Sequence, residues 1–337
     1  MRVVCLRGGF GFENLTLEER PLPTCGKNQV LVRVRAVSLN FRDVLMARGE
    51  YNPRQPLPLV LGSDAAGEVI ERGPSVTRVR LGDRVCPIFA ERWLVGSVTR
   101  DALRSTRGGP LDGTLSEFLV VDEQALVAAP SHLDFTEAAC LPCAGVTAHR
   151  AVRELGGLQA GQSLVTIGTG GVSLFALSFA RALGANIVVV SRSLEKAERA
   201  RELGATHTLC SRQTPSWGKL ARDLCGEGAE QVVEVGGAGT LAESVRAVRP
   251  GGTILLIGVL AGGIAELDLR PILMQDVRIQ GVFVGSRASF EAMNEFVSKH
   301  AVRPVIDRVF AVEDVRAAFE RVASGEQFGK VCIEFAM

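Results

Sequence analysis

One stretch of the chain decides its fold: residues 164–193 read LVTIGTGGVSLFALSFARALGANIVVVSRS. The stretch begins with a short apolar run with β-branched residues, which is typical of a buried parallel strand. A glycine cluster follows, and from 172 to 183 the apolar residues recur at helical spacing. A second apolar run occupies 187–190. The stretch therefore predicts a strand–helix–strand unit with its glycines at the first turn.

The glycine turn predicts a dinucleotide-binding site. Residues without a Cβ let the backbone bend tightly and let a pyrophosphate approach the N–H groups at the helix N-terminus. Ser173 holds the third glycine position of the usual pattern, and serine is small enough to keep helix and strand in contact. A glycine-rich turn without a ligand is the alternative. The residues expected to bind the cofactor here are Gly168, Thr169, Gly170, Gly171 and Val172.

The end of the second strand distinguishes the two nicotinamide cofactors. NAD sites usually place an Asp or Glu there, which binds the ribose 2′-hydroxyl. Here the strand ends in Ser191, Arg192 and Ser193, and Lys196 follows one helical turn later. A carboxylate would repel a 2′-phosphate, whereas arginine can form a charge-assisted fork with it. We therefore expect NADP(H) bound by Ser191, Arg192 and Lys196, with NAD as the alternative cofactor and a solvated surface pair as the alternative role of the two cations.

Composition excludes several classes of protein. The net charge of +1 gives no electrostatic footprint for nucleic acid or an anionic membrane. The first ten residues predict a strand and no signal peptide, and the apolar run at 253–267 is broken by glycines, so no membrane span is expected. The eight cysteines are scattered, which favours reduced, mostly buried thiols and a cytoplasmic location over disulfides.

Three regions differ in pattern. Residues 1–123 predict short strands between Gly and Pro turns, including a half-exposed antiparallel strand at 30–37. Residues 124–285 alternate strands and helices with short connections, which predicts a doubly wound parallel sheet of the Rossmann type. Residues 286–337 do not continue that alternation, so we expect them to pack back on the N-terminal domain.

Seven short stretches together resemble the medium-chain dehydrogenase/reductase superfamily, and the resemblance covers essentially the whole chain. They are SLNFRDVLMARGEY, LGSDAAGEV, LGDRV, LPCAGVTAH, IGTGGVS, VVEVGGAGT and the GSR of GVFVGSR. The chain is most similar to the zinc-free quinone oxidoreductase branch, and NFRDVL is similar to the enoylreductase domains of polyketide synthases. The resemblance implies a β-rich GroES-like catalytic domain beside the Rossmann domain. It also implies a homodimer formed through the strand expected at 277–284.

The resemblance bears on zinc. Zinc-dependent members take ligands from a Cys in the segment that matches SLNFRD, from a His and a Glu in a GHE motif, and from a Cys or Asp near LPCAGVT. In this chain the positions hold Asn40, then Ser63 and Asp64, then Cys143. Catalytic zinc needs three protein ligands of the Cys, His, Asp or Glu kind, so we expect no metal.

The resemblance also implies the catalytic residues. It places Asn40, Arg42 and Asp43 in the substrate cleft, with Tyr51 on the following loop. Asn40 is the expected carbonyl contact, and Asp43 is expected to serve more as a structural group. Tyr51, the only tyrosine, can orient a carbonyl and donate a proton, or it can simply cover apolar surface.

Further cofactor contacts are expected after the later strands of the sheet, because ligands bind at the carboxyl ends of strands in open α/β sheets. Gly236, Gly258 and Val259 are the candidates for the ribose and nicotinamide sites. By resemblance, the backbone of Phe283, Val284 and Gly285 is expected to contact the carboxamide. Arg287 is expected to reach a phosphate or ribose.

These features predict an NADP(H)-dependent oxidoreductase that works without zinc on quinones or α,β-unsaturated carbonyl compounds. Hydride addition to such a conjugated system gives a delocalised anion, which hydrogen bonds and one proton donor can support. A zinc-independent alcohol dehydrogenase and a nucleotide-binding protein with little turnover are the alternatives. The expected partner is a small-molecule substrate, with neither nucleic acid nor membrane.

Overall fold

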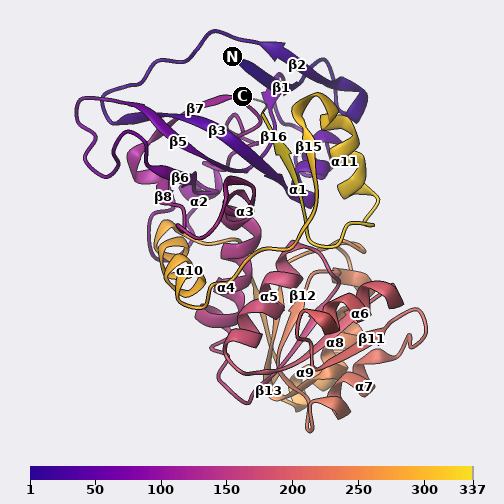
Figure 1. Cartoon of the computed structure of the whole chain (residues 1–337). Helices are drawn as coiled ribbons and strands as arrows, with labels where there is room; N and C mark the ends of the chain where they lie inside the picture. The colour runs from indigo at the N-terminus through magenta and orange to yellow at the C-terminus, as the bar shows by residue number, and fades with distance from the viewer. Residues whose placement is uncertain (336–337) are drawn as a thin grey trace. The chain divides into compact units, whose positions relative to one another are not determined.

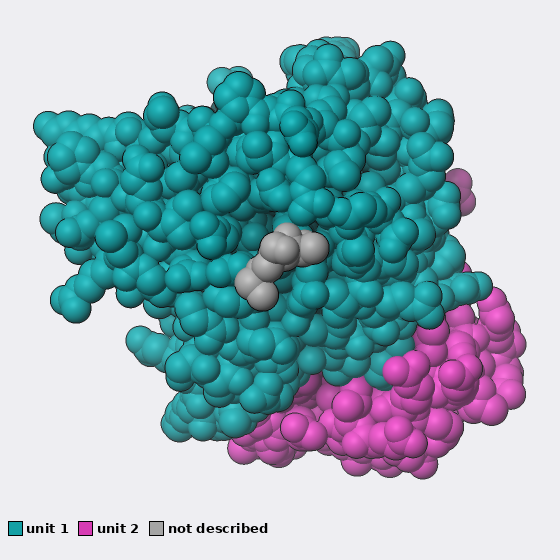
Figure 2. All heavy atoms as spheres, turned by 45° about the horizontal axis from the view of Figure 1, so that its top comes forward, with its two compact units in different colours: residues 1–146, 285–337 teal, residues 147–284 magenta. Residues whose placement is uncertain are grey.

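The computed structural model describes residues 1–335, which form two compact units (Figures 1 and 2). Unit 1 combines the N-terminal part of the chain, through Val146, with the C-terminal part from Gly285 onward. Unit 2 is Thr147–Val284. The chain therefore leaves unit 1 once and returns to it once.

Unit 2 is a doubly wound parallel sheet, as the sequence predicts. Its strand order is β11-β10-β9-β12-β13-β14, and every neighbouring pair is parallel. Its strands are β9 (Ser163–Ile167), β10 (Asn186–Ser191), β11 (His207–Cys210), β12 (Ala229–Glu234), β13 (Val248–Leu256) and β14 (Arg278–Gly281). Its helices and helical turns are α4 (Val146–His149), which begins at the boundary, η4 (Arg150–Leu155), α5 (Gly171–Ala182), α6 (Leu194–Glu202), α7 (Trp217–Leu224), η5 (Gly237–Gly239), α8 (Leu241–Ala247) and α9 (Arg270–Met274).

The order of the strands fixes where this unit can bind a ligand. The chain starts at β9 in the middle of the sheet, runs to one edge and then returns to fill the other side from β12. The connections therefore change direction between β9 and β12. In open α/β sheets such a switch point, at the carboxyl ends of the strands, is where ligands bind. The glycine turn follows β9 directly.

Unit 1 consists of two sheets and the helices around them. The three-stranded sheet has the order β2-β1-β4, and the larger sheet has the order β15-β16-β3-β5-β6-β8, with β7 also paired to β3. The strands are β1 (Arg2–Leu6), β2 (Leu15–Glu19), β3 (Gln29–Leu39), β4 (Leu59–Val60), β5 (Asp64–Arg72), β6 (Arg84–Pro87), β7 (Phe118–Asp122), β8 (Leu126–Ala128), β15 (Ile306–Ala311) and β16 (Lys330–Glu334). The helices and helical turns are η1 (Phe12–Asn14), α1 (Phe41–Ala47), α2 (Arg100–Leu103), η2 (Glu123–Ala125), α3 (Phe135–Ala139), η3 (Leu141–Gly145), α10 (Arg287–Lys299), η6 (Val312–Asp314) and α11 (Val315–Ala323).

The boundary between the two units differs from the one at 123 that composition suggests. Residues 124–146 belong to unit 1, because β8 is a strand of its larger sheet and α3 packs against β3 and β5. The change to helical patterning near residue 130 marks helices of unit 1 and not the start of the parallel sheet. Secondary structure and unit membership therefore change at different positions in the chain.

Strand β3 is the centre of unit 1, and it is more buried than its alternating sequence suggests. It pairs with β16, β5 and β7, and Arg33 alone among its residues is exposed. The prediction of a half-exposed strand was wrong because α3 covers one face while the apolar core covers the other. Residues at the end of this strand are consequently held on several sides.

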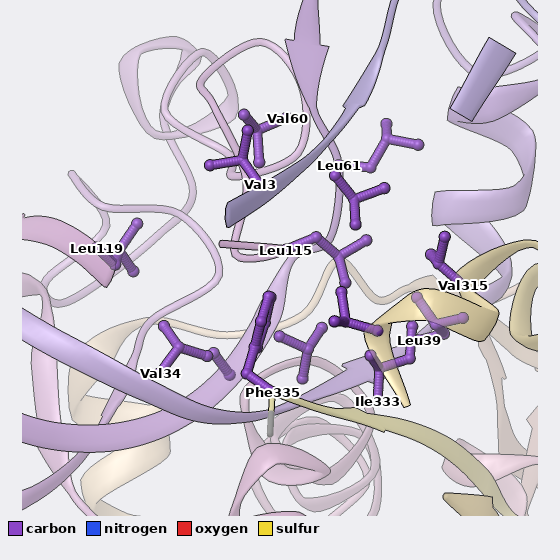
Figure 3. Close-up of a cluster of buried hydrophobic side chains, with 14 of the residues drawn as sticks. Val3, Val34, Leu39, Val60, Leu61, Leu115, Leu119, Val315, Ile333 and Phe335 are labelled. Carbon is purple, nitrogen blue, oxygen red and sulfur yellow. The ribbon is translucent and has the colours of Figure 1, made fainter. Parts of the chain in front are cut away.

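The C-terminal return completes the core of unit 1. Strand β16 pairs antiparallel with β3 and places Val331 opposite Leu39, and α11 packs against β16. Figure 3 shows Val315 and Ile333 from this segment among Leu39, Val34 and Leu115 of the N-terminal part. Residues 286–335 thus lie in unit 1 with the N-terminal part of the chain. The return also delivers Lys330, the first residue of β16, to the end of β3.

Two smaller features complete the fold. The strand expected at 277–284 is shorter in the structure: β14 is an edge strand of four residues with a single neighbour, β13. None of the helices within residues 1–335 has the length and apolar character needed to cross a bilayer.

Candidate active site

Four polar side chains meet in unit 1 because neighbouring strands of one sheet deliver them. Asn40 lies between β3 and α1, and Ser63 and Asp64 lie where β5 begins. Lys330 begins β16. Strand β3 pairs with both β5 and β16, so the end of β3 has these residues on either side. We call this set the Asn40–Lys330 ring.

The ring is closed by directed hydrogen bonds. Lys330 Nζ donates to Asn40 Oδ1 at 2.5 Å, and Asn40 Nδ2 donates to Ser63 Oγ at 3.1 Å. Ser63 Oγ donates to Asp64 Oδ1, also at 3.1 Å. Asp64 Oδ2 accepts from the backbone N–H of Cys143 at 3.2 Å and lies 4.0 Å from Lys330 Nζ. Each member thus fixes the orientation of the next.

The ring holds a buried ion pair. The Asp64 side chain is fully buried and that of Lys330 is 4% exposed. Burial raises the pKa of Asp64 to about 6, while the ammonium of Lys330 and the nearby amide of Asn40 act to lower it. A buried lysine is rare unless it is paired, because an ammonium loses its hydration on burial. Asn40 is half-buried, and it is the least buried of the four residues of the ring.

The residues that follow Asn40 mainly anchor α1. Asp43 is fully buried, accepts the backbone N–H of Asn40 at 2.9 Å and lies 3.4 Å from Arg42 Nη1. Burial raises the pKa of Asp43, and the Arg42 guanidinium opposes that shift. Arg42 Nη1 also donates to the carbonyl of Arg107 at 2.7 Å. Asp43 thus holds the start of α1 and the backbone of Asn40.

Tyr51 is placed differently from Asp43. Its side chain is 47% exposed, and the guanidinium of Arg42 lies 5.1 Å from the centre of its ring. This cation–π contact holds the ring on one side. Tyr51 as a whole is exposed, which is compatible with a substrate contact.

The donor set of the ring does not fit zinc. The ring contains an amide, a hydroxyl and a single carboxylate, and the ammonium of Lys330 bonds the amide oxygen of Asn40 and faces the carboxylate of Asp64. Burial raises the pKa of the Cys143 thiol, which disfavours the thiolate that binds metals. Residues 1–335 contain no group of three or more His, Cys, Asp or Glu side chains that could hold a metal. The ring is therefore unsuited to catalytic zinc.

The glycine turn of unit 2 fits a dinucleotide. Gly168 has φ +80°, a conformation that favours glycine, and a Cβ built on Gly170 would meet no atom within 4 Å. No side chain within the described residues caps the N-terminus of α5, which starts at Gly171. Ser173, at the third glycine position, is buried and donates to the carbonyl of Ile167 at 2.7 Å. The turn therefore offers open space before an uncapped helix N-terminus, as phosphate binding requires.

The residues expected to select the cofactor lie at the end of β10. Ser191 is buried, and its hydroxyl accepts from the N–H of Ser193 at 3.2 Å. Arg192 is exposed and Lys196 is half-buried in the first turn of α6. No carboxylate takes the place of an acidic ribose ligand in this segment. The structure thus offers an exposed cation beside a small hydroxyl.

The third set of cofactor candidates follows β12 and β13. Gly258 must be a glycine, because a Cβ would lie 2.5 Å from the carbonyl oxygen of Val235. Gly236 is held by Glu234, which is fully buried and accepts from the N–H groups of Gly236 at 2.7 Å and of Gly237 at 3.0 Å. Val259 is exposed beside Gly258. Glu234 therefore shapes the turn at the carboxyl end of β12.

The last candidates lie where unit 2 ends and unit 1 resumes. Phe283 and Val284 end unit 2, and Val284 has φ +33°, which is strained for a β-branched residue. Gly285 begins the returning part of unit 1, where a Cβ would lie 2.5 Å from Val146 Cγ1. Arg287 lies in α10 and donates to Gln124 Oε1 at 2.6 Å, so unit 1 itself supplies a partner for its guanidinium.

Two site residues were missed by sequence reasoning. Lys330 is the only charged residue among the first four of the strand KVCI, a signal that a buried charge could have been expected there. Glu234 likewise ends the apolar run QVVE. Lys330 is the first residue of its core strand and Glu234 is the last of its own. At either position a buried ionisable group needs partners that other segments supply.

Comparison with known sequences identifies the family. The family described as zinc-binding dehydrogenase matches residues 171–299, and the alcohol dehydrogenase GroES-like domain matches residues 26–131. The chain is 38% identical to a zinc-type alcohol dehydrogenase-like protein of Schizosaccharomyces pombe, over 96% of either chain. It is 28% identical to an acryloyl-coenzyme A reductase of Sulfurisphaera tokodaii, over 94% of this chain and 96% of the relative. It is also 28% identical to a quinone oxidoreductase-like protein 2 homolog of Nematostella vectensis, over 91% of this chain and 82% of the relative.

Solved structures give the same result. A putative alcohol dehydrogenase of Sinorhizobium meliloti superposes with a TM-score of 0.92 at 41% identity, over 99% of this chain and 98% of that one. A 2-octenoyl-CoA carboxylase reductase in complex with NADP and 2-octenoyl-CoA superposes with a TM-score of 0.87 at 26% identity, over 96% of this chain and 82% of that one. The chain belongs to the medium-chain dehydrogenase/reductase superfamily and is an NAD(P)-dependent oxidoreductase.

Proposed function

We propose that this chain is a zinc-independent, NADP(H)-dependent reductase of quinones or α,β-unsaturated carbonyl compounds. The observation that carries the proposal is the Asn40–Lys330 ring. It presents an amide hydrogen-bond donor backed by a buried cation, and its donor set does not fit a metal. Such a site suits a reaction that builds negative charge on oxygen without needing a metal to start it.

The chemistry follows from the groups at the ring. Bound NADPH supplies the hydride. Addition of hydride to a conjugated carbonyl moves negative charge onto the carbonyl oxygen, where a preorganised donor stabilises it. The amide of Asn40, already oriented by Lys330 and Ser63, is the proposed donor. Tyr51, an exposed residue, is the proposed second contact and a candidate to donate the proton.

Oxidation of a simple alcohol is the second candidate, because the relative in Schizosaccharomyces pombe is named for that class. That reaction needs an alkoxide, and the usual stabiliser of an alkoxide near neutral pH is a metal ion. The ring lacks a fitting donor set for one. The names of two other relatives favour reduction, since acryloyl and 2-octenoyl thioesters are α,β-unsaturated carbonyl compounds.

A substrate panel tests the proposal. The purified protein is assayed with NADPH against quinones, enones and enoyl thioesters, and with NADP⁺ against primary and secondary alcohols, with and without chelator. We expect reduction of at least one conjugated acceptor, unchanged by chelation, and no stoichiometric zinc by elemental analysis. Alcohol oxidation that chelation abolishes, or one tightly held zinc per chain, would contradict the proposal. Cofactor binding without turnover would point to a nucleotide-binding protein.

We further propose a homodimer formed through the edge of the sheet in unit 2. Strand β14 has unpaired backbone groups on one side, and apolar side chains beside it are exposed, Leu273 and Met274 at 80% each. Edge strands and apolar patches of this kind are usually covered, and a second copy related by a two-fold axis would cover both. Light scattering should give a dimer at micromolar concentration and a monomer for Leu273→Lys. A monomeric wild type would contradict this.

We also propose a cytoplasmic location. All eight cysteines are unpaired in the structure, including Cys140 and Cys332, whose sulfur atoms lie 3.6 Å apart. Unpaired thiols persist in reducing compartments. Fractionation of the source cells with an antibody to this chain would test it.

A further inference from the structure

Lys330 is buried far more deeply than a lysine usually is, and its environment is built for its charge. Nζ donates to the carbonyl of Leu39 at 2.8 Å as well as to Asn40 Oδ1, and it lies 4.0 Å from Asp64 Oδ2. The antiparallel register of β16 with β3, which pairs Val331 with Leu39, brings Lys330 beside Asn40 although the two lie at opposite ends of the sequence. A packing role would be met by an apolar residue at lower desolvation cost. The burial of a charge here needs another explanation.

The ammonium fixes which way the amide of Asn40 points, together with the capping box of α1, in which the Asn40 side chain faces the backbone N–H of Asp43. An amide carries an oxygen that only accepts and a nitrogen that only donates, and the two orientations are nearly equal in shape. An ammonium has donors alone, so it accepts no bond from an amide nitrogen. Asn40 Oδ1 must therefore face Lys330, and Nδ2 must face Ser63. Of the two N–H bonds on that nitrogen, the bond to Ser63 uses one.

The same contact strengthens the amide as a donor. A charge-assisted hydrogen bond to the amide oxygen draws electron density away from the nitrogen, and bonds in a chain polarise one another inside a protein. The effect is greatest where water is excluded, and both Lys330 and Asp64 are buried. The N–H groups of Asn40 are thus better suited to an oxygen that becomes negative during the reaction.

We propose that Lys330 is a positioning residue, whose ammonium orients and polarises the amide of Asn40 toward the substrate oxygen. The inference rests on the proposed function, because it requires that Asn40 contacts this oxygen. The positive charge at the ring thus comes from a side chain of the protein. Its action passes through one side chain, which makes the proposal open to a direct test.

The test is a double-mutant cycle between Lys330 and Asn40, measured as kcat with a quinone or enone that the wild type reduces. Lys330→Met removes charge and donor, and Lys330→Gln keeps a donor without the charge. We expect Lys330→Met to lower kcat roughly 10- to 100-fold, with Lys330→Gln between it and wild type. In an Asn40→Ala background the same changes should alter kcat by less than about twofold, because the group they act through is gone. Equal losses in both backgrounds would overturn the proposal.

Folding controls keep the result interpretable. The dissociation constant for NADPH and the thermal midpoint are measured for every variant. Lys330→Met leaves Asp64 without its cation, so Lys330→Met is also prepared with Asp64→Asn, which removes the unpaired carboxylate. The double-mutant cycle is then measured with whichever of these two variants lowers the thermal midpoint less. Wild-type kcat in the Lys330 variants at unchanged fold would overturn the proposal.

A measurement without turnover separates this inference from the proposed function. In ¹⁵N-asparagine-labelled protein, the side-chain amide signal of Asn40 is assigned by its loss in Asn40→Ala. We expect Lys330→Met to shift that signal, because the charge on the amide oxygen has been removed. If the wild type reduces none of the acceptors, the proposed function fails whatever this signal does. An unshifted signal overturns the orienting role of Lys330 even in an active enzyme.

Discussion

The two candidate sites of this molecule are built in opposite ways. In unit 1 the Asn40–Lys330 ring consists of side chains that satisfy one another's hydrogen bonds before any ligand arrives. In unit 2 the turn at 168–171 consists of glycines, which leave space and an uncapped helix N-terminus. The first site is organised by its own residues. At the second site the N-terminus of the helix has no capping side chain, and a bound ligand can accept hydrogen bonds from its backbone N–H groups.

This difference separates two kinds of requirement. Under the proposed function, side chains in the ring must be the right groups in the right orientation, because they would act on the substrate. The glycine turn must mainly be free of side chains, since its backbone N–H groups do the binding. Substitutions in the ring should therefore change chemistry at constant cofactor affinity. Substitutions at the turn and at Arg192 should change cofactor affinity first.

The largest effect is expected for Asn40→Ala. Removing one donor to a developing oxyanion costs about 2.7–4 kcal/mol, or roughly 10²–10³-fold in kcat. The proposed contact of Asn40 is with the substrate oxygen and not with the cofactor, so the dissociation constant for NADPH should change little. Steady-state kinetics with a conjugated acceptor and a fluorescence titration of NADPH measure the two quantities. An equal loss of NADPH affinity would break the distinction between the sites.

The next effect concerns the stability of the ring and its dependence on pH. The pKa of Asp64 is raised from 3.8 to about 6 in the folded state by burial. Between these values the folded state binds more protons than the unfolded state, so this group's contribution to stability is lost as pH rises from about 4 to 6. Asp64→Asn removes that dependence. The difference in the free energy of unfolding, variant minus wild type, should therefore increase by about 2–3 kcal/mol from pH 4 to pH 7.

Urea unfolding at several pH values measures this effect. Ser63→Ala is the matched control, because it removes a hydrogen bond to Asp64 but keeps the carboxyl group. Its stability should keep the pH dependence of wild type. Parallel curves for wild type and Asp64→Asn would show that the carboxyl of Asp64 titrates normally in the folded protein.

The contrast between the sites also explains how much the sequence could predict. The glycine turn is contiguous, and its strand, helix and return strand all lie within residues 164–193, so local pattern was enough to predict the parallel sheet and to propose the cofactor site at its turn. The ring is assembled from β3, β5 and β16, at both ends of the chain. Asn40 was identified only through resemblance, and Lys330 was missed because no local pattern links a lysine before an apolar strand to an asparagine that lies beside it only in the folded sheet. The burial of β3 was missed for the same reason, since α3 covers it from another part of the sequence.

A smaller effect is expected at the cofactor site. Arg192→Ala should weaken NADPH binding by about 1.5–3 kcal/mol, the range for a hydrogen bond to a charged group, and change NADH binding little. Because Arg192 is exposed, the loss should shrink as salt is added. Arg201→Ala is the control: Arg201 is an exposed arginine of the same helix region that pairs with Glu198. Isothermal titration of wild type and both variants with each cofactor measures the affinities, and equal losses of NADPH and NADH affinity in Arg192→Ala would mean that Arg192 is only a surface residue.

The last prediction asks whether the turn is shaped for the fold or for the ligand. Gly170 has φ −84° and ψ −177°, an extended conformation open to any residue, and a Cβ there meets nothing within 4 Å. Gly170→Ala should thus change the free energy of unfolding by less than about 0.5 kcal/mol, since the lower entropy of the unfolded chain offsets the weaker helix cap. The methyl group would occupy the space before the helix N-terminus, so NADPH should bind roughly tenfold more weakly, or about 1.4 kcal/mol.

Gly168→Ala is the matched variant for that prediction. Its φ of +80° strains any residue with a Cβ, so it should destabilise the protein itself by about 1 kcal/mol or more. Thermal or urea unfolding of the cofactor-free protein and NADPH titration then give opposite patterns for the two glycines. If Gly170→Ala lost stability but not NADPH affinity, the open space at the turn would belong to the fold, and unit 2 would no longer differ from unit 1 in leaving room for its ligand.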